Sequence, residues 1–462
     1  MTPRTLALAL VIGALCRPVV AVGQQPQHDM MRMADSAARP TLLEVPITHA
    51  GSGTAWLPAA SPRRMVHVDA GEWTVMLHGE AFGLNNQQQT LHGGAQWAML
   101  DWEMASASRS AAGGLLRFNA MTSLESFTLP DSGYHELLQT GETFRGRRRA
   151  DVEHADQPLM ELSGAYDHTI TSKLATTVYA AAVGEPALGP VAYIHRPSAD
   201  GDPFAPIGQH WQDAAHASVG VVTAGAFTRA VQVEGSVFNA REPNDGRLGT
   251  DLQNARLDSY AGRLTVLPAD QVAVSAWAGY LADHDPLTPG LGMQRYGASI
   301  LGEIPLANGQ SLSAAAIWGM NVHHHSDRLH VHDATAPQRL SHPSSSVLFE
   351  ATWRWSERTS LYGRAEQVQK MADDFGFLGG DLAQLFTVRA LSVGVTHDVL
   401  TARGLSVGIG ARGALNLMPA TLEPTYQTRH AAGFVMYLTL QPAGSRRGQR
   451  SGTSTNEMDS FR

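Results

Sequence analysis

The chain has 462 residues, of which 43% are hydrophobic and only 16% are charged, and its formal net charge is −8. About a quarter of the residues in typical soluble domains are charged, so this composition indicates a surface that is not mostly in contact with water. The modest charge gives no reason to expect a nucleic-acid partner. After the N-terminus there is no run of about 18 apolar residues, which excludes a helical membrane span and leaves strands as the elements that would cross a bilayer.

Residues 1–23 read as an export signal. Arg4 supplies the positive charge, LALALVIGALC (6–16) is a short apolar core, and AVG (21–23) is a small-residue cleavage site. The core is too short to span a bilayer. Cys16 is the single cysteine of the chain and leaves with the signal, so we expect no disulfide, thiolate metal site or cysteine nucleophile in the mature chain.

Residues 24–70 are rich in Pro, His and Met. They predict an irregular N-terminal periplasmic arm, or alternatively a plug that folds back into the following domain. Trp56 and Leu57 are the side chains that could anchor it.

The segment VLFEATWRWSE (347–357) shows the pattern on which the fold prediction depends. One parity holds Val347, Phe349, Ala351, Trp353 and Trp355, and the other holds Leu348, Glu350, Thr352 and Arg354. Comparable alternating runs of about 9 to 12 residues recur along the chain, and this is the length that a tilted strand needs to cross a bilayer. In a membrane barrel the apolar parity faces lipid and the polar parity faces the lumen.

Sixteen such strands are predicted. They begin near Trp73, Ala95, Gly114, Leu159, Ala175, Ala215, Val231, Leu257, Gln271, Met293, Gln310, Val347, Ser360, Leu385, Gly404 and Ala431. Eight long loops alternate with seven tight turns, which is the layout of a transmembrane β-barrel. A soluble propeller or β-helix would show a fixed-period repeat, and none is evident. The fold prediction is therefore an all-β, transmembrane, antiparallel up-and-down barrel of about 16 strands (14 to 18) over residues 71–441, followed by a polar tail at 442–462.

In its signal peptide, its lack of a mature cysteine and its alternating hairpins from about Trp73 to Leu440, the chain resembles the outer-membrane β-barrel proteins of Gram-negative-type bacteria. The resemblance is to porin-like architecture, and no motif identifies a characterised family. It implies a bacterial outer-membrane location, contact with membrane lipid and lipopolysaccharide, and insertion by the barrel assembly machinery. The oligomeric state stays open.

The polar parity of the predicted strands carries charges of both signs, which predicts weak ion selectivity or salt bridges across a filled lumen. The residues expected to face the lumen are Asp101, Glu103, Arg117, Glu125, Glu234, Arg263, Glu350, Arg354, Arg364, Glu366 and Arg412. A barrel of this size is wide enough for an aqueous channel. Long loops such as 126–157 or 184–214 would close it if they folded inward.

Histidine is the remaining chemical signal, because imidazole suits Cu, Zn and Ni. His323, His325, His330 and His332 fall in one predicted long loop, and His195, His210 and His216 fall in or beside another. These loops could bind a transition metal at the cell surface, although histidine is also an ordinary polar loop residue. No other cofactor is expected.

The sequence has no phosphate loop, dinucleotide fingerprint, zinc helix or serine elbow, so we do not expect an enzyme. It favours a passive or gated pore for small solutes. The alternative is a non-conducting surface protein whose His-rich loops bind metal or another partner, and an open lumen would separate the two. The alternating faces also predict that Glu350→Gln, in the lumen, barely affects assembly.

Overall fold

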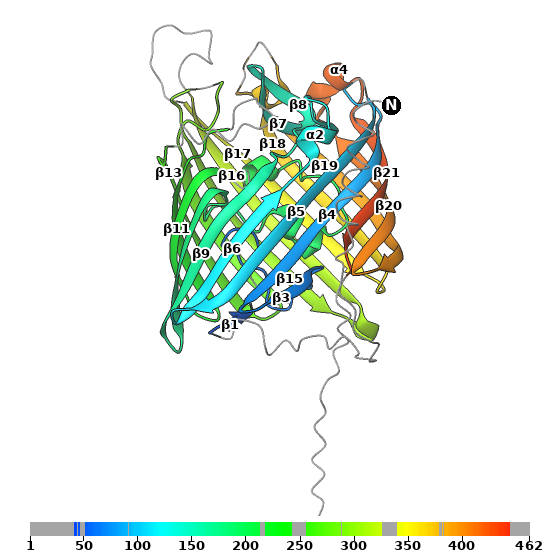
Figure 1. The fold of residues 1–462 in the computed structure, drawn as a ribbon. Helices are drawn as coiled ribbons and strands as arrows, with labels where there is room; N and C mark the ends of the chain where they lie inside the picture. The colour runs from blue at the N-terminus through cyan, green and yellow to red at the C-terminus, as the bar shows by residue number, and fades with distance from the viewer. Residues whose placement is uncertain are drawn as a thin grey trace, which may run out of the picture.

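The structure, a computed structural model, describes residues 41–43, 45–46, 51–90, 92–212, 218–242, 256–287, 289–325, 340–377, 381 and 383–443. It is a closed barrel of sixteen antiparallel strands whose spatial order follows the chain order, as the sequence predicted (Figure 1). None of the described helices is long and apolar enough to cross a bilayer. The predicted signal peptide and most of the polar tail lie outside the described residues.

The barrel strands are β4 (Trp73–Gln88), β5 (Ala95–Ala111), β6 (Gly114–Thr122), β9 (Leu159–Thr171), β10 (Leu174–Gly184), β11 (Ser218–Phe227), β12 (Val231–Phe238), β13 (Ser259–Ala269), β14 (Val272–Leu281), β15 (Met293–Pro305), β16 (Ser311–His325), β17 (Leu340–Arg354), β18 (Thr359–Met371), β19 (Leu385–Ala402), β20 (Leu405–Leu417) and β21 (His430–Pro442). β21 pairs with β4 and closes the barrel. The short strand β3 (Val66–Ala70) pairs with the start of β4. All predicted strand starts fall within three residues of the observed ones except that of β17, which begins seven residues earlier.

The connections alternate in length and so define two ends of the barrel. At the turn end, tight turns occupy residues 112–113, 172–173, 228–230, 270–271, 306–310, 355–358 and 403–404. Ala112 (φ 48°) and Gly113 (φ 76°) are both left-handed, the backbone that two-residue hairpin turns need. At the loop end lie the longer connections, which carry α2 (Glu125–Thr128), the hairpin β7 (Tyr134–Phe144) and β8 (Arg147–Glu153), η8 (Asp373–Phe375), η9 (Ala420–Leu422) and α4 (Glu423–Tyr426). The remaining short elements are β1 (Thr41–Leu42), β2 (Val45–Pro46) and η6 (Ala307–Gly309).

The two parities of each strand meet different surroundings. On β17, Phe349 is 59% exposed on the outer face, whereas its inward neighbours Leu348 and Glu350 are 0% and 3% exposed. Exposed aromatic rings lie toward both rims: Trp97 and Tyr260 near the loop end, and the stacked pair Trp353 and Trp355 at the turn end. An outward apolar face between aromatic rings is how a barrel sits in a bilayer.

Antiparallel barrels with an even number of strands, short turns at one end and long loops at the other are proteins of the bacterial outer membrane. This chain is therefore an outer-membrane β-barrel, as expected from its sequence.

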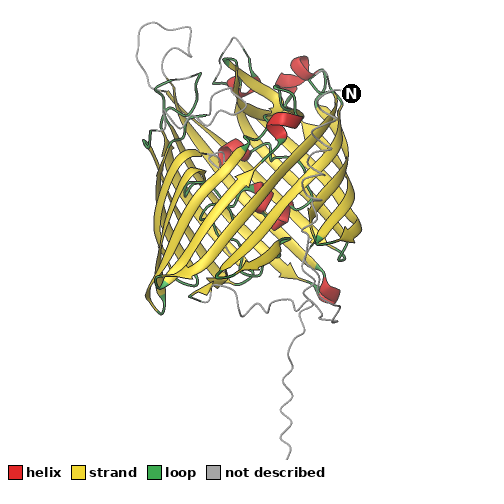
Figure 2. Ribbon diagram, viewed as in Figure 1, coloured by secondary structure: helices red, strands yellow, loops and turns green. Residues whose placement is uncertain are grey.

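Two segments of the chain occupy the lumen, and the β7–β8 hairpin enters it from the loop end, where Leu137 and Leu138 pack with Ile207 of the first segment and Val368 of β18. The first is the connection between β10 and β11, of which residues 185–212 are described and are called here the lumen segment. It contains η3 (Tyr193–His195), η4 (Pro197–Ala199) and α3 (Gln209–Gln212), short helices that lie within the barrel outline (Figure 2). The second comprises residues 51–64, called here the N-terminal arm, whose residues 51–58 are buried. The structure thus gives residues 51–64 the plug arrangement.

Candidate functional site in the barrel lumen

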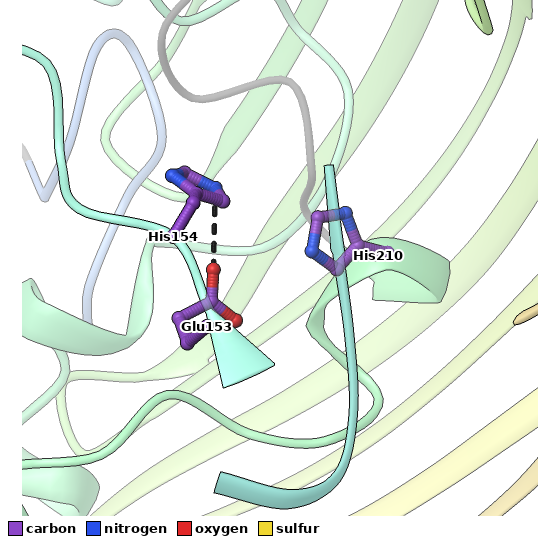
Figure 3. Close-up of side chains that lie close together, drawn as sticks. All are labelled: Glu153, His154 and His210. Carbon is purple, nitrogen blue, oxygen red and sulfur yellow. Dashed lines mark ion pairs between the residues drawn. The ribbon is translucent and has the colours of Figure 1, made fainter. Parts of the chain in front are cut away.

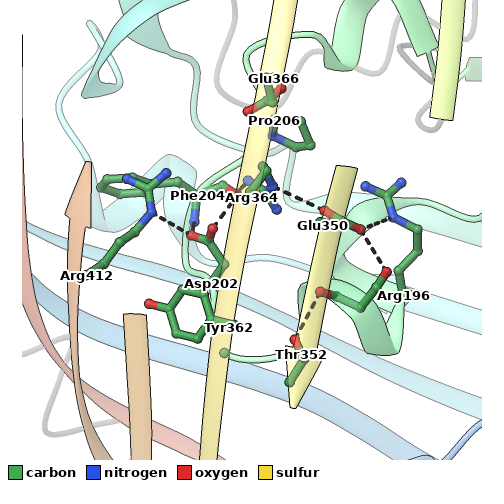
Figure 4. Close-up of polar contacts among 12 residues, drawn as sticks. Arg196, Asp202, Phe204, Pro206, Glu350, Thr352, Tyr362, Arg364, Glu366 and Arg412 are labelled. Atoms are coloured by element: carbon green, nitrogen blue, oxygen red, sulfur yellow. Dashed lines mark hydrogen bonds and ion pairs between the residues drawn. The ribbon is translucent and has the colours of Figure 1, made fainter. Parts of the chain in front are cut away.

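The lumen segment is held to the inner wall by a chain of alternating charges (Figure 4). Arg196 of the segment pairs with Glu350 of β17 at 2.7 Å, and Glu350 also pairs with Arg364 of β18 at 3.1 Å. Asp202 of the segment lies 3.5 Å from Arg364 and 3.0 Å from Arg412 of β20. Glu350 and Arg364 are direct partners in the strand register, so one strand pair presents both signs to the segment.

These charges are almost completely removed from water. The side chains of Arg196, Glu350, Arg364 and Asp202 are 1–2% exposed. Buried ions are tolerated only when they are paired and hydrogen-bonded. Each charge here is paired with one of opposite sign, so the segment and the wall are electrostatically dependent on one another.

A second contact fixes the middle of the segment. Asp200 accepts a hydrogen bond from Arg354 at 2.7 Å, and Arg64 of the N-terminal arm lies 3.9 Å away. Burial alone would raise the pKa of Asp200, but the two guanidinium groups outweigh it and hold that pKa below its ordinary value. Asp200 is therefore a carboxylate that joins the arm, the segment and the wall.

The N-terminal arm covers part of the turn end of the lumen. Thr54 accepts hydrogen bonds from Arg263 on its hydroxyl at 3.0 Å and from Gln232 on its carbonyl at 3.2 Å. Trp56 packs edge-on against Phe227 with ring centroids 5.6 Å apart. Polar groups of β12 and β13 thus position the arm, and aromatic packing beside the turn at 228–230 holds it against the wall.

The structure places eight of the eleven predicted lumen charges on the inward parity of a strand. They are Arg117, Glu234, Arg263, Glu350, Arg354, Arg364, Glu366 and Arg412. Arg263 pairs with Glu234 at 3.0 Å, Arg117 pairs with Asp167 at 3.1 Å, and Glu366 accepts the backbone N–H of Gly208. Most of these charges are covered by the two lumen segments of the chain and do not line an open channel.

The other three predicted lumen charges were assigned wrongly. Asp101 and Glu103 share the outward parity of β5 with Trp97, which is 79% exposed. Glu125 lies in α2 and not on a strand, and its carboxylate accepts the backbone N–H of Asp101. At this height in the barrel the inward-facing side chains of β5 are apolar, so the rule that polar side chains face the lumen does not hold there.

Two inward-facing cations were missed. Arg295 of β15 is 0% exposed and donates to the backbone carbonyl of His210. Lys370 of β18 is also 0% exposed and donates to Thr140 at 2.7 Å. Lys370 has the same parity as Glu366, so strand alternation could have found it. Arg196, Asp200 and Asp202 lie in an irregular segment, where no periodicity marks them.

Two polar cavities lie along the wall formed by β4, β5, β6 and β9. The turn-end cavity is lined by Arg63, His78, Ser106, Arg117 and Asn119, among others, and has a volume of about 40 Å³. The loop-end cavity is lined by Glu125, Tyr134, Glu153, His154, Asp156 and Tyr193, among others, and has a volume of about 10 Å³. Volumes of this size hold at most a few water molecules.

An apolar cluster separates the two cavities and is called here the constriction. It consists of Trp102, Met104, Met121, Met160 and Ile194. Met104 and Met121 are partners across the β5–β6 ladder, and a register shift beside Met121 accompanies the inward position of Met160. Met104 also lines the turn-end cavity, whereas Met160 and Ile194 line the loop-end cavity. The constriction is therefore the contact point between them.

The predicted histidine loops are only partly described. His195 is buried in the lumen against Trp102 and His78, at centroid distances of 4.7 and 5.9 Å, so its predicted place on the cell surface is wrong. His210 is in α3, also inside the barrel. Both follow the lumen segment inward, because that segment buries Phe204 and Trp211 and pairs its charges with the wall.

The second histidine group is also placed differently from the prediction. His323 and His325 belong to strand β16, at its loop end, and not to a loop. His216, His330 and His332 lie outside the described residues.

One set of side chains has the composition and spacing of a metal site (Figure 3). One ligand atom from each of Glu153, His154 and His210 lies within 4.8 Å of the other two. Nε2 of His154 is 3.2 Å from Oε1 of Glu153. Burial, followed by the nearby positive groups, lowers the pKa of His210 well below its ordinary value, so this imidazole is neutral. Only His210 of this set was among the predicted ligands.

Comparison with known proteins supplies no family: no family model matches the chain, and no curated protein matches it. Solved structures of similar shape include OmpF of Salmonella typhi in complex with daunomycin (12% identity, 81% of this chain and 100% of that chain, TM-score 0.49). Others are OmpT of Vibrio cholerae (8%, 81% and 99%, 0.46) and an anion-selective porin from Comamonas acidovorans (8%, 80% and 100%, 0.46). Likenesses this distant say nothing of solute or gating, which depend on the residues of this chain.

Proposed function

We propose that the protein is a gated pore for small solutes, with the route running along the β4–β6 and β9 wall. The observation that carries this proposal is the pair of polar cavities whose linings meet at the constriction, Met104 lining one and Met160 and Ile194 the other. The lumen segment, the N-terminal arm and the β7–β8 hairpin occupy much of the remaining lumen. A solute that crosses the barrel would pass the loop-end cavity, the constriction and the turn-end cavity in that order, or in reverse.

The constriction has the chemistry of a gate. A narrow apolar ring blocks ions and polar solutes because water leaves it, which is a known way to close a channel. Three of its five side chains are methionines, which are unbranched and change rotamer easily. Ile194 belongs to the lumen segment, so a small displacement of that segment would widen the ring. A permanent seal would not require side chains of this flexibility.

The buried ion pairs of the lumen favour a lumen segment that stays in place while the route opens. The charged chain through Arg196, Glu350 and Arg364 holds the lumen segment on the opposite wall, at β17 and β18. Opening at the constriction therefore does not require the segment to leave the barrel. A pore that opens only at the constriction differs both from an unrestricted passive pore and from a non-conducting surface protein.

The test is single-channel conductance of the refolded mature protein in a planar bilayer. Trp102→Ala should give more frequent and larger openings than the native chain, because it removes the largest side chain of the constriction. Trp97→Ala is the matched control, since Trp97 is on the same strand but on its outer face. Silence from both variants, in protein that shows the heat-dependent gel shift of a folded barrel, would contradict the proposal and favour a non-conducting role.

A further inference from the structure

The strongest unassigned chemistry in the molecule is the set of Glu153, His154 and His210. These residues come from separate parts of the chain: the first two from the end of β8 and the residue after it, and the third from α3 of the lumen segment. Two imidazoles and a carboxylate are the donors that Zn²⁺ and its neighbours in the transition series take in three-ligand sites. We propose that they bind one divalent transition-metal ion at the edge of the loop-end cavity, which Glu153 and His154 line.

The spacing is close to what an ion requires. Ligand atoms about 2.0–2.1 Å from a tetrahedral Zn²⁺ lie about 3.3 Å from one another. The pair of His154 Nε2 and Glu153 Oε1 already has this separation, at 3.2 Å. The full set lies within 4.8 Å, so a modest rotation of His210 completes the geometry.

A contact on the other ring nitrogen of His154 fixes the orientation of this side chain. Its Nδ1 lies 3.1 Å from the backbone carbonyl of Ala155, to which an Nδ1–H donates. This hydrogen bond selects the tautomer whose Nε2 carries the lone pair and faces Glu153. Metal-bound histidines are usually oriented in this manner by a second hydrogen bond.

His210 supplies an independent observation. Its Nε2 is buried and has no hydrogen-bond partner among the described residues. Its backbone carbonyl is fixed by Arg295 at 2.6 Å and Asn321 at 2.9 Å, so α3 is held on the wall of β15 and β16. A buried ring nitrogen without a partner costs free energy, and binding a metal ion would recover it.

The cavity itself favours a cation. Its lining includes three carboxylates, on Glu125, Glu153 and Asp156, and neither lysine nor arginine is among its lining residues. Three protein ligands leave a fourth position on a tetrahedral ion, which faces this cavity and is open to water or to a solute ligand.

A bound ion would also add a link between two elements that already touch, since Gln139 donates to the carbonyl of Pro206 and Tyr134 stacks on Phe204. It would join the β7–β8 hairpin at the loop end to the lumen segment that carries Ile194 of the constriction. This consequence rests on the proposed gating function, whereas metal binding itself does not. Occupancy would hold the segment in place and favour the closed route.

The binding test is titration calorimetry of Zn²⁺ into the refolded, metal-stripped, tag-free mature protein. We expect one high-affinity site, weakened by about tenfold or more in His154→Gln and in His210→Gln. His210→Asp keeps a ligand atom and should retain more affinity than His210→Gln. His168→Gln is the control, because His168 is an exposed residue near the turn end. The heat-dependent gel shift checks that each variant is folded.

Two results would overturn the site. One is native affinity in folded His154→Gln and His210→Gln. The other is loss of the high-affinity site only when His323, His325, His330 and His332 are replaced together by glutamine. The consequence for gating is measured separately, as closure of the Trp102→Ala channel by Zn²⁺. If that channel never opens while calorimetry shows the site, the proposed function fails and the metal site stands.

Discussion

Replacing Glu350 by glutamine tests whether the lumen segment depends on buried charge. Glu350 is 3% exposed and accepts from Arg196 at 2.7 Å, from Ser198 at 2.9 Å and from Arg364 at 3.1 Å. The substitution keeps the size of the side chain and removes its charge. Two guanidinium groups then share a neutral amide, and the amide nitrogen cannot accept a hydrogen bond from either of them.

The expected magnitude follows from this burial. Breaking a buried ion pair by removing one partner costs about 3–5 kcal/mol. Glutamine retains one acceptor oxygen, so we expect a loss of stability near the lower limit, about 3 kcal/mol. A loss of this size raises the population in which the segment is detached from the wall about a hundredfold. The hydrogen bonds between the barrel strands do not depend on this charge, so we expect the lumen segment, and not the barrel, to lose stability. The alternating faces alone had predicted that this substitution barely affects assembly.

Hydrogen–deuterium exchange read by mass spectrometry measures this local opening. Peptides that cover residues 191–204 should exchange faster in Glu350→Gln than in the native protein, while peptides from the barrel strands should not change. Glu72→Gln is the matched control, because Glu72 forms an exposed pair with Arg109 at 3.4 Å, and such pairs contribute little. Equal exchange of residues 191–204 in the two variants would refute the reasoning.

Two further predictions concern the wall. Val393→Arg, on the outer face at the middle of β19, should lower the free energy of unfolding in lipid vesicles by about 2–4 kcal/mol. Leu405→Arg, at the turn end, should lower it by only about 0–1 kcal/mol. Equal costs would contradict the membrane orientation. Gly319→Ala should loosen α3, since the added Cβ would lie 2.2 Å from a backbone carbonyl of that helix, and Gly413→Ala, with open space around it, should not; exchange in residues 207–212 distinguishes them.

Strand alternation predicted the barrel well because lipid imposes one physical rule on the outer face. In 347–357 the apolar parity faces outward and the polar parity inward, as the sequence indicated. The rule failed on β5. There Trp102 and Met104 face the constriction, so the inward parity is as apolar as a lipid face, and Asp101 and Glu103 were placed inside.

The contents of the lumen could not be predicted in the same way. The sequence left open whether residues 184–214 fold inward, because the partners that hold them are distant in the chain. Arg196 meets Glu350 and Asp202 meets Arg412 across more than 150 residues, and no local pattern encodes such pairs. The same applies to His210, which meets Glu153 and His154 only because its loop enters the barrel. Histidine content predicted a metal site but not its ligands or its location.

The position of the lumen segment is the central claim, and an engineered disulfide tests it most directly. The single cysteine of the chain is Cys16, which a chain expressed from residue 24 lacks, and a Cβ at Gly208 would lie 3.0 Å from Cβ of Ser346 on β17. A disulfide needs about 3.5–4.5 Å between these atoms, so a small outward shift of the segment allows the bond. With Gly208→Cys and Ser346→Cys together, the folded barrel should form the disulfide under mild oxidation and show no free thiol by mass spectrometry of maleimide-treated protein. Two maleimide-labelled thiols in a folded barrel would show that the segment does not lie against β17 and would contradict the claim.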